Sequence, residues 1–364
     1  MAKDGKEALG SMGADTPLAI LSQKNQHLSH YFKQLFAQVS NPPIDPIRER
    51  AVMSLHTWVG GAKNVLKETP EQCTSIALAR PVLTDGELAR IRHLQHADYR
   101  PCTLDMVYTA EQGLEAGLEA LCDEAVSRAE AGYNVFILSD KAASRDQLPI
   151  PALLATGAVH HHLIRTDWRS RVALIVETGD AREVHHLATI IGYGAVAVNP
   201  YLAFASLKAL CHSEPALSGL SPAKAEKNYL KALEKGLLKV MSKMGISTIQ
   251  SYHGAQIYEI LGLSDEVVSR CFTGTISRIG GMGFAGIDRE VRERHQSAWE
   301  SNPSGTGLLP VGGVYQWRRK GEAHLLNPKT IHLLQKSTRL GRYDLYREYA
   351  QAIDEQMAQP ITLR

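Results

Sequence analysis

The sequence predicts an α/β protein whose strands alternate with helices around a parallel sheet. From about residue 100 onward, short apolar runs typical of buried strands alternate with longer segments of helical periodicity. This order implies parallel pairing, because each helix carries the chain back to the start of the next strand. No glycine fingerprint of a dinucleotide-binding fold follows any of these runs. The pattern therefore favours a TIM-barrel-like arrangement, as a degenerate or partial barrel.

The N-terminal part is predicted to contain a flexible entry and one helix. Residues 1–16 are polar and glycine-rich without periodicity. Residues 26–41 carry apolar side chains at helical spacing and are predicted as an amphipathic helix. The prolines of the 42–46 segment end that helix and keep the chain extended. Asp45 precedes a proline, so we expect it to cap the next helical turn.

The alternating region and the C-terminal part supply the remaining elements. The predicted strands are 103–108, 133–140, 171–180, 195–203 and 246–252. The predicted helices are 110–131, 150–167, 181–194, 204–212, 223–244 and 254–261. Beyond residue 300 the chain becomes rich in glycine and proline, and we place a domain boundary there. Residues 327–358 are predicted as a helical extension that begins at Asn327–Pro328.

Composition excludes several classes of protein. The 364 residues are 44% hydrophobic and 21% charged, as in an ordinary globular protein with a sizeable core. A net charge of +2 without a basic tail does not suit a nucleic-acid binder. No window of 18 consecutive apolar residues predicts a membrane span. The five cysteines are scattered without a CxxC spacing, so neither a zinc site nor an iron–sulfur site is predicted. Scattered free thiols are typical of proteins in a reducing cytoplasm, which is the expected compartment.

Two groups of polar residues are candidates for chemistry. Histidines cluster at 160–162 and 185–186 on predicted helices. Neighbouring helical residues point about 100° apart, so adjacent histidines cannot share one ion; structural roles are favoured and no metal site is predicted. The second group follows the predicted strands, at the rim where parallel sheets place their sites. Capping and loop hydrogen bonds are the favoured interpretation of this group, and a polar cavity or passage is the alternative. Its members are Ser139, Asp140, Glu177, Asn199, Gln250 and Ser251.

Two further patterns are weaker. The glycine-rich run at 274–284 could hold a phosphate, but it lacks a P-loop lysine and is better explained as a tight packing loop. Lysines recur at three- and four-residue steps along 224–243, which is typical of a solvated helix face; a docking surface for an acidic domain is the alternative. No nucleophile motif is present, so no catalytic residue is predicted.

Long strings of the sequence resemble one known family. Residues 17–50, beginning PLAILSQKNQHLSHYFKQLF, resemble the opening of the central domain of glutamate synthase. So do 171–203 (RVALIVETGDAREVHHLATIIGYGAVAVNPYLA), 227–263 and 272–284. Residues 315–354 resemble the lead-in to the flavin-binding domain of that family. The resemblance implies a flexible entry at 1–16, the central domain at 17–300 and, at 301–364, a linker with the truncated start of the FMN-binding domain.

The resemblance also implies a function. Glutamate synthases release ammonia from glutamine in a glutaminase domain with a terminal cysteine nucleophile. The ammonia passes through a tunnel to a barrel domain carrying FMN and a 3Fe–4S cluster, where it and 2-oxoglutarate form glutamate. The central domain connects the two. This chain has Ala at position 2 and no cysteine cluster, so neither catalytic residues nor cofactor ligands are carried over to it.

The expected role is a non-catalytic connecting domain that helps to form the ammonia tunnel. Its expected partners are glutaminase and FMN domains, in the same chain or as separate chains. One alternative is a stand-alone ligand-binding protein or enzyme that uses the strand-end rim, and another is an interaction module for separate glutaminase and flavin polypeptides. The candidate tunnel or interdomain residues are Asn41, Asp45, Arg48, Asn199, Tyr201, Lys243, Ser247, Gln250, Ser251, Tyr252 and Gln256.

Overall fold

A parallel sheet forms the centre of the molecule. The computed structural model describes residues 1–7, 13–37, 42–61, 64, 66–300, 311–358 and 360–361. Among these residues, a sheet of four parallel strands has the order β4-β6-β8-β9. Its strands are β4 (Pro101–Asp105), β6 (Val135–Ser139), β8 (Ala173–Glu177) and β9 (Ala197–Asn199). The predicted α/β class with a parallel sheet is therefore confirmed.

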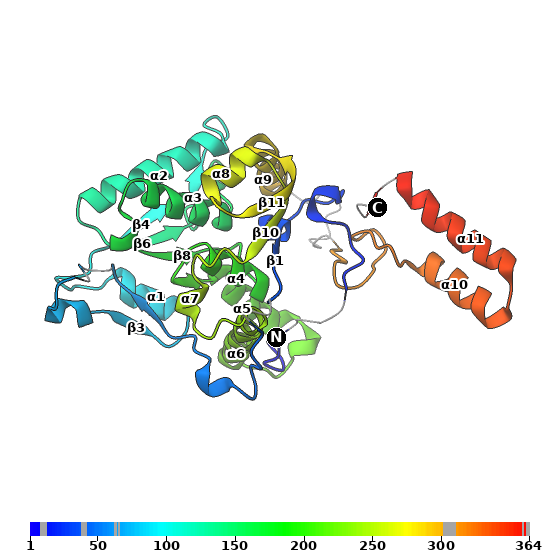
Figure 1. The fold of residues 1–364 in the computed structure, drawn as a ribbon, viewed down its shortest axis with the longest axis horizontal. Coiled ribbons are helices and arrows are strands. Elements are labelled where there is room, and N and C mark those ends of the chain that lie inside the picture. Colours follow the sequence, from blue (N-terminus) through cyan, green and yellow to red (C-terminus); the bar gives the residue numbers. More distant parts are fainter. Residues whose placement is uncertain are drawn as a thin grey trace.

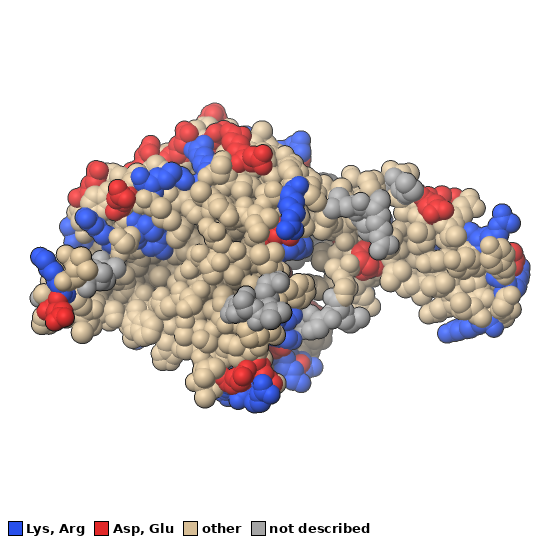
Figure 2. All heavy atoms as spheres, viewed as in Figure 1, with Lys and Arg blue, Asp and Glu red and all other residues tan. Residues whose placement is uncertain are grey.

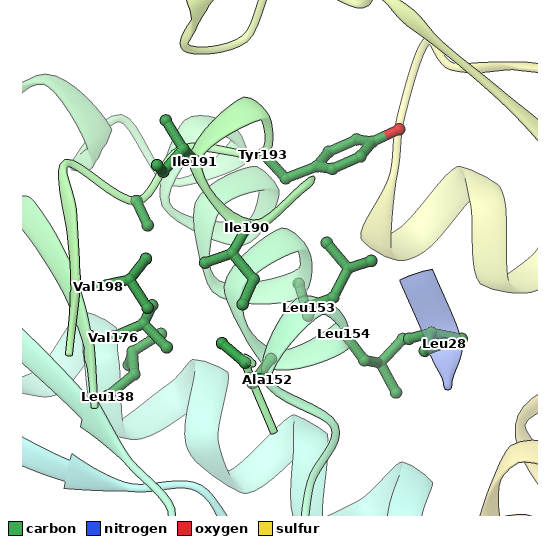
Figure 3. Close-up of a cluster of buried hydrophobic side chains, with 14 of the residues drawn as sticks. Leu28, Leu138, Ala152, Leu153, Leu154, Val176, Ile190, Ile191, Tyr193 and Val198 are labelled. Carbon is green, nitrogen blue, oxygen red and sulfur yellow. The ribbon is translucent and has the colours of Figure 1, made fainter. Parts of the chain in front are cut away.

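The helices between these strands cover one face of the sheet. They are α2 (Leu114–Glu130), α3 (Ala152–Arg165) and α4 (Val184–Gly192). Each strand is added beside the previous one in the same direction, and right-handed crossovers then place every connecting helix on the same side. Figure 3 shows Leu138, Val176 and Val198 of the strands directed at residues of these helices, such as Ala152 and Ile190. This single winding is the arrangement of a barrel segment, whereas a doubly wound sheet has helices on both faces.

The opposite face of the sheet is also filled. The alternate strand residues Val135, Ile137 and Ile175 pack with Leu88 and Ile91 of α1 (Asp85–Arg92). Beside α1, β2 (Thr57–Val59) pairs antiparallel with β3 (Ile76–Leu78). The free edge of β9 is bonded by the Pro81–Leu83 segment, because Val198 N donates to Pro81 O (2.7 Å). The space that a full barrel encloses with further strands is therefore occupied here by α1 and its flanking chain.

Two long helices pack beside this core and anchor the N-terminus. They are α5 (Tyr201–Ser213) and α6 (Pro222–Lys243). Residues 1–7 lie along α6, where Asn228 Nδ2 donates to the carbonyls of Ala2 and Lys3 (both 2.9 Å). Glu7 also pairs with Lys239 at 3.3 Å. The lysines of α6 are otherwise mostly exposed, as expected of a solvated face.

Three of the predicted helices and strands are wrong. The helix predicted at 26–41 is instead a short 3-10 turn (Leu28–Tyr31) followed by β1 (Phe32–Gln34), and residues 38–41 lie outside the described residues. The segment 246–252 forms α7 (Ile249–Tyr252) with one isolated bridge, not a strand of the parallel sheet. The helix predicted at 254–261 is replaced by β10 (Tyr258–Leu263).

A second small sheet accounts for these differences. β10 pairs antiparallel with β1 and parallel with β11 (Ile276–Met282), so Phe32 is fully buried as a strand residue. Gly254 (φ +66°) and Gln256 (φ +51°) adopt left-handed conformations that a helix does not accept. The glycine-rich run, predicted as a tight packing loop, instead supplies the strand β11. A Cβ on Gly281 would lie 2.4 Å from Gly262 O, so glycine allows the two strands to approach closely. In the sequence, α8 (Asp265–Cys271) lies between β10 and β11 and packs against α3, and α9 (Phe284–Trp299) follows β11.

The C-terminal part forms a helical arm. α10 (Pro328–Leu340) and α11 (Tyr343–Asp354) pack against each other and extend away from the rest of the molecule (Figure 1). As predicted, Asn327 opens α10, and its side chain accepts from the amides of Lys329 and Thr330. No helix within the described ranges is both long and apolar enough to cross a membrane.

Candidate functional site

Polar side chains meet at the carboxyl ends of the parallel strands. Ser139, Glu177 and Asn199 end β6, β8 and β9 and are paired in register, so they stand in one row across the sheet. Glu177 lies at the centre of this row with only 1% of its surface exposed. Sequence reasoning correctly placed these three residues, together with Asp140, on the rim. It wrongly added Gln250 and Ser251, because their segment is not part of this sheet.

The carboxylate of Glu177 is saturated by its neighbours. Arg92 of α1 contacts Oε2 at 2.6 Å, and Lys141 Nζ lies 2.9 Å from Oε1. Ser139 Oγ also donates to Oε2 at 2.6 Å. Burial alone would raise the pKa of Glu177, but the Ser139 hydrogen bond and the two cations outweigh it and lower the pKa. A carboxylate held in this way is a structural anion rather than an available base.

Asp140 lies next to this group in a different environment. Thr178 Oγ1 donates to its Oδ2 at 2.5 Å, and the Gly179 amide donates at 3.0 Å. Burial raises the pKa of Asp140 to about 6, because desolvation outweighs these hydrogen bonds. Tyr201 also hydrogen-bonds Asp140, and its ring lies under Lys141 Nζ at 4.9 Å. The rim is thus one connected network of side chains.

Asn199 closes the network at the β9 side. Its Nδ2 donates to Leu83 O and to Asp85 Oδ1, both at 2.9 Å. Its side chain is fully buried, and its Oδ1 has no hydrogen-bond partner among the described residues. Asn199 therefore ties the start of α1 to the end of β9.

A second group of predicted residues gathers on a surface away from the rim. The segment 42–57 runs beside the end of α6 and the chain that follows it: Ile44 N donates to Ser242 O and Ser54 N donates to Ser247 O, both at 2.8 Å. Gln250 Nε2 reaches Thr57 Oγ1 at 3.3 Å. We call this area the 42–57/242–251 surface. Its predicted members are Asp45, Arg48, Lys243, Ser247, Gln250 and Ser251.

The remaining predicted residues have individual roles or positions. Asp45 accepts from the amides of Ile47 and Arg48 (2.9 and 3.0 Å), as the predicted cap. Tyr252 is fully buried, and its hydroxyl bonds Gln34 Oε1 (2.9 Å) and the hydroxyl of Tyr258 (2.6 Å). Gln256 is exposed at the turn before β10. Asn41 lies outside the described residues.

The histidines at 160–162 do not converge on one point. The rings of His160 and His161 are nearly perpendicular, and His160 Nδ1 accepts from Arg169 Nε at 2.8 Å. Burial next to Arg169 lowers the pKa of His160 to about 3, so it is neutral at pH 7. Arg169 in turn donates to the carbonyls of Val172 and Gly194. This group has the structural role that the sequence favoured.

A different histidine group was missed by sequence reasoning. His27 and His30, from the N-terminal segment, meet His186 at the start of α4, and the rings of His27 and His186 stack with centroids 3.9 Å apart. His27 Nε2 lies 3.0 Å from Asp180 Oδ1, and His186 Nε2 lies 3.3 Å from Glu183 Oε1. We call these residues the histidine joint. The pairs His27/His30 and Glu183/His186 each have i, i+3 spacing, which was the available signal.

The histidine joint also contacts the C-terminal part. Tyr315 OH donates to Glu183 Oε2, and Glu322 Oε2 accepts from Ser22 Oγ (2.8 Å) and Gln26 Nε2 (3.0 Å). His324 pairs with Asp15 at 3.0 Å. A cavity of about 620 Å³ lies between the 17–24 segment and the arm. The N-terminal segment, α4 and the 315–324 segment that leads to the arm therefore meet in one place.

Comparisons with known proteins place this geometry in context. A family model described as the glutamate synthase central domain matches residues 1–264. The large chain of NADPH glutamate synthase from Bacillus subtilis (strain 168) is 45% identical over 97% of this chain and 23% of its own length. Ferredoxin-dependent glutamate synthase from Pyropia yezoensis is 41% identical over 100% of this chain and 24% of its own length. The chain thus spans about a quarter of the length of these relatives.

The likeness to one solved flavin-binding domain is faint. The flavin-binding domain of baker's yeast flavocytochrome b2 shares 15% identity over 52% of this chain and 43% of that chain, with a TM-score of 0.33. That similarity is too weak to support a conclusion about fold or function.

Proposed function

The chain belongs to the glutamate synthase central domain family, and from that premise we propose that it is a connecting domain that performs no bond-making itself. In this proposal it fixes the orientation of an ammonia-releasing glutaminase part and an FMN-dependent, glutamate-forming part, and it helps to enclose the route of ammonia between them. The relatives are glutamate synthases of which this region is only one part. That relationship supports a role inside a larger assembly, with the glutaminase and FMN parts in the same chain or in separate chains.

The state of the strand-end rim is the observation that carries the non-catalytic part of the proposal. In parallel α/β proteins this rim is where substrates and cofactors bind. Here Glu177 is bonded to Arg92, Lys141 and Ser139 at 2.6–2.9 Å. Arg92 belongs to α1, which also covers the inner face of the sheet. Side chains that satisfy each other leave few groups to bind a substrate, so the rim stabilises the fold.

Two features support a connecting role. The N-terminal segment and the 315–324 segment that leads to the arm meet at the histidine joint, so the preceding and following parts of a longer chain would be held in a defined relation. Figure 2 shows a broad area in the middle of one face with few Lys, Arg, Asp or Glu side chains, while charges of both signs lie around it. Surfaces that become buried between domains are depleted in charge in the same way.

Enclosure matters chemically because ammonia must stay unprotonated to react. In neutral bulk water most ammonia takes up a proton and loses the lone pair that attacks a carbonyl carbon. A rigid domain that excludes water between two sites prevents this loss. We propose that the 42–57/242–251 surface contributes to this enclosure, with Asn199, Tyr201, Tyr252, Gln256 and Asn41 as further lining or interdomain candidates. The five free cysteines also suit a reducing cytoplasm, which we propose as the compartment.

Two measurements test the proposal. First, the purified chain is scanned for visible absorption and assayed with 2-oxoglutarate, ammonia and a reductant. We expect neither flavin nor iron–sulfur bands and no glutamate; turnover or a bound redox group would overturn the proposal. Second, Gln250→Ala and Ser251→Ala are introduced into an intact glutamate synthase carrying this segment, with the α2 variant Glu124→Ala as control. We expect more glutamine hydrolysed per glutamate formed only in the first two, and an unchanged ratio in all three would remove this surface from the ammonia route.

A further inference from the structure

The histidine joint contains three side chains whose ligand atoms converge. One nitrogen each of His30 and His186 and one oxygen of Glu183 lie within 4.8 Å of one another. They come from separate parts of the chain: His30 from the turn before β1, and Glu183 and His186 from the start of α4. We propose that these residues form a binding site for a divalent transition-metal ion, with Zn²⁺ as the ion that suits two imidazoles and one carboxylate best.

The spacing of Glu183 and His186 matches coordination better than hydrogen bonding. Two ligands at Zn–N and Zn–O distances of about 2.0–2.1 Å in a tetrahedron are themselves about 3.3 Å apart. His186 Nε2 and Glu183 Oε1 are 3.3 Å apart, yet this nitrogen makes no hydrogen bond within the described part of the chain. The direction in which His186 Nε2 would donate or accept therefore does not point at Glu183 Oε1. This is expected when both atoms face a common third point.

His30 is already held in the tautomer that a metal requires. Gln26 Nε2 donates to the carboxylate of Glu322 at 3.0 Å, and a carboxylate can only accept, so the Gln26 amide oxygen must face His30. That oxygen lies 3.0 Å from His30 Nδ1, which therefore carries the proton. Nε2 of His30 is left with a free lone pair. A carbonyl that orients the far nitrogen of a ligating histidine is the usual second partner in metal sites.

The donor set of the three groups also suits a divalent ion. Two imidazole nitrogens and one carboxylate oxygen form a donor set of the kind that binds zinc in catalytic sites. Glu183 supplies the negative charge, and a water molecule would take the fourth position.

One contact sets a limit on the affinity. The Arg182 amide donates to His186 Nδ1 at 3.2 Å, so in the metal-free structure the proton of this ring is on Nε2. Coordination through Nε2 moves that proton to Nδ1 and displaces the Arg182 amide. We therefore expect weaker binding than in a site whose ligands are all preorganised, and we expect binding to alter the start of α4.

The bound metal would strengthen the connection between three segments. It would join the N-terminal segment to α4 directly, and through Glu183 it would reach Tyr315 of the C-terminal part. This role is independent of the ammonia route, so the site can be tested without any assay of glutamate formation. The ligands were not combined by the sequence analysis because they lie far apart in the chain.

The experiment is a metal titration of the full chain after treatment with a chelator. Zn²⁺ binding is measured by calorimetry, and Co²⁺ is used as a visible probe of four-coordinate geometry. The variants are His30→Gln and Glu183→Gln, and the control is His56→Gln, an exposed histidine outside the joint. Circular dichroism shows which variants are folded, and Glu183→Gln keeps an oxygen for Tyr315.

We expect one Zn²⁺ per chain, an intense Co²⁺ band and a rise in melting temperature on metal addition. Each ligand variant should lose at least about tenfold in affinity, as is typical when even a supporting residue of a metal site is removed, and the control should bind like the parent chain. The proposal is overturned by three results: no saturable binding, binding that survives in both ligand variants, or binding that the His56→Gln control loses equally.

Discussion

Glu177→Gln tests whether the strand-end rim stabilises the fold through its buried charge. The side chain of Glu177 is 2% exposed, while those of Arg92 and Lys141 are 30% and 46% exposed. Removing one member of a fully buried ion pair costs about 3–5 kcal/mol. The two cations here can recover hydration, so the Lys141 pair is worth less than about 1 kcal/mol and the Arg92 pair only slightly more. With a weakened Ser139 hydrogen bond, we expect a loss of about 2 kcal/mol in the free energy of unfolding.

The assay is urea denaturation at pH 7 followed by circular dichroism, with Glu124→Gln as the matched control. Glu124 pairs with Arg128 on the surface of α2, where both side chains are more than 40% exposed, so its loss should cost less than about 0.5 kcal/mol. The pKa of Glu177 is lowered, so its stabilisation is present above the ordinary pKa of 4.5 and disappears as the pH falls through the folded-state value. The difference between parent and variant should therefore shrink at acidic pH. Equal stability of Glu177→Gln and Glu124→Gln at pH 7 would refute the reasoning.

Three further outcomes follow from single contacts. Gly236→Ala in α6 should destabilise the fold by about 1–3 kcal/mol despite the better helix propensity of alanine, because the new Cβ would lie 2.2 Å from Val184. In Gly86→Ala of α1 the new Cβ meets nothing within 4 Å, so this variant should be more stable by up to about 1 kcal/mol. Thermal melts of both variants check these expectations. The pKa of Asp140 is raised to about 6, so between about pH 4 and pH 6 the folded state holds a proton that the unfolded state has lost. In this range Asp140 therefore makes the free energy of unfolding fall as the pH rises, by at most about 3 kcal/mol. Asp140→Asn should remove that slope from urea midpoints measured across the same range. Tyr315→Phe removes the hydrogen bond to Glu183. It should raise the rate of trypsin cleavage within the exposed Arg318–Lys320 stretch by up to about tenfold. An unchanged rate would show that this contact does not hold the segment that leads to the arm.

The central sheet could be predicted because its signal is local. The residues of β6 and β8 are all buried, so each strand reads as an uninterrupted apolar run bounded by turns. The connecting helices α2, α3 and α4 have the lengths and spacing that such crossovers need. The same local pattern placed Ser139, Asp140, Glu177 and Asn199 on one rim, because the ends of parallel strands share an edge.

The small sheet could not be predicted from local pattern. Phe32 is paired with Ile260, more than two hundred residues away, and this pairing overrides the helical spacing of the apolar residues around it. The strand β10 did carry a signal, since Tyr258 and Ile260 alternate with half-buried neighbours, but its apolar run also fitted a short helix. At 246–252, Ile249 and Tyr252 are buried three residues apart, which fits a helical turn despite strand-forming residue types.

The histidine joint shows why a contact between distant segments is hard to recognise from the sequence. Its spacings, His27 to His30 and Glu183 to His186, are visible in the chain, but their meeting depends on a fold that brings together residues more than 150 positions apart. An enzyme site often has a local motif, because a nucleophile or a phosphate needs several groups from one loop. A joint needs only that each segment supply one group, and its meaning arises from contact between segments. The residues that fix the arm relative to the sheet are therefore distributed, and substitutions at His30, Glu183 and Tyr315 should change orientation and dynamics of the arm while leaving the central sheet intact.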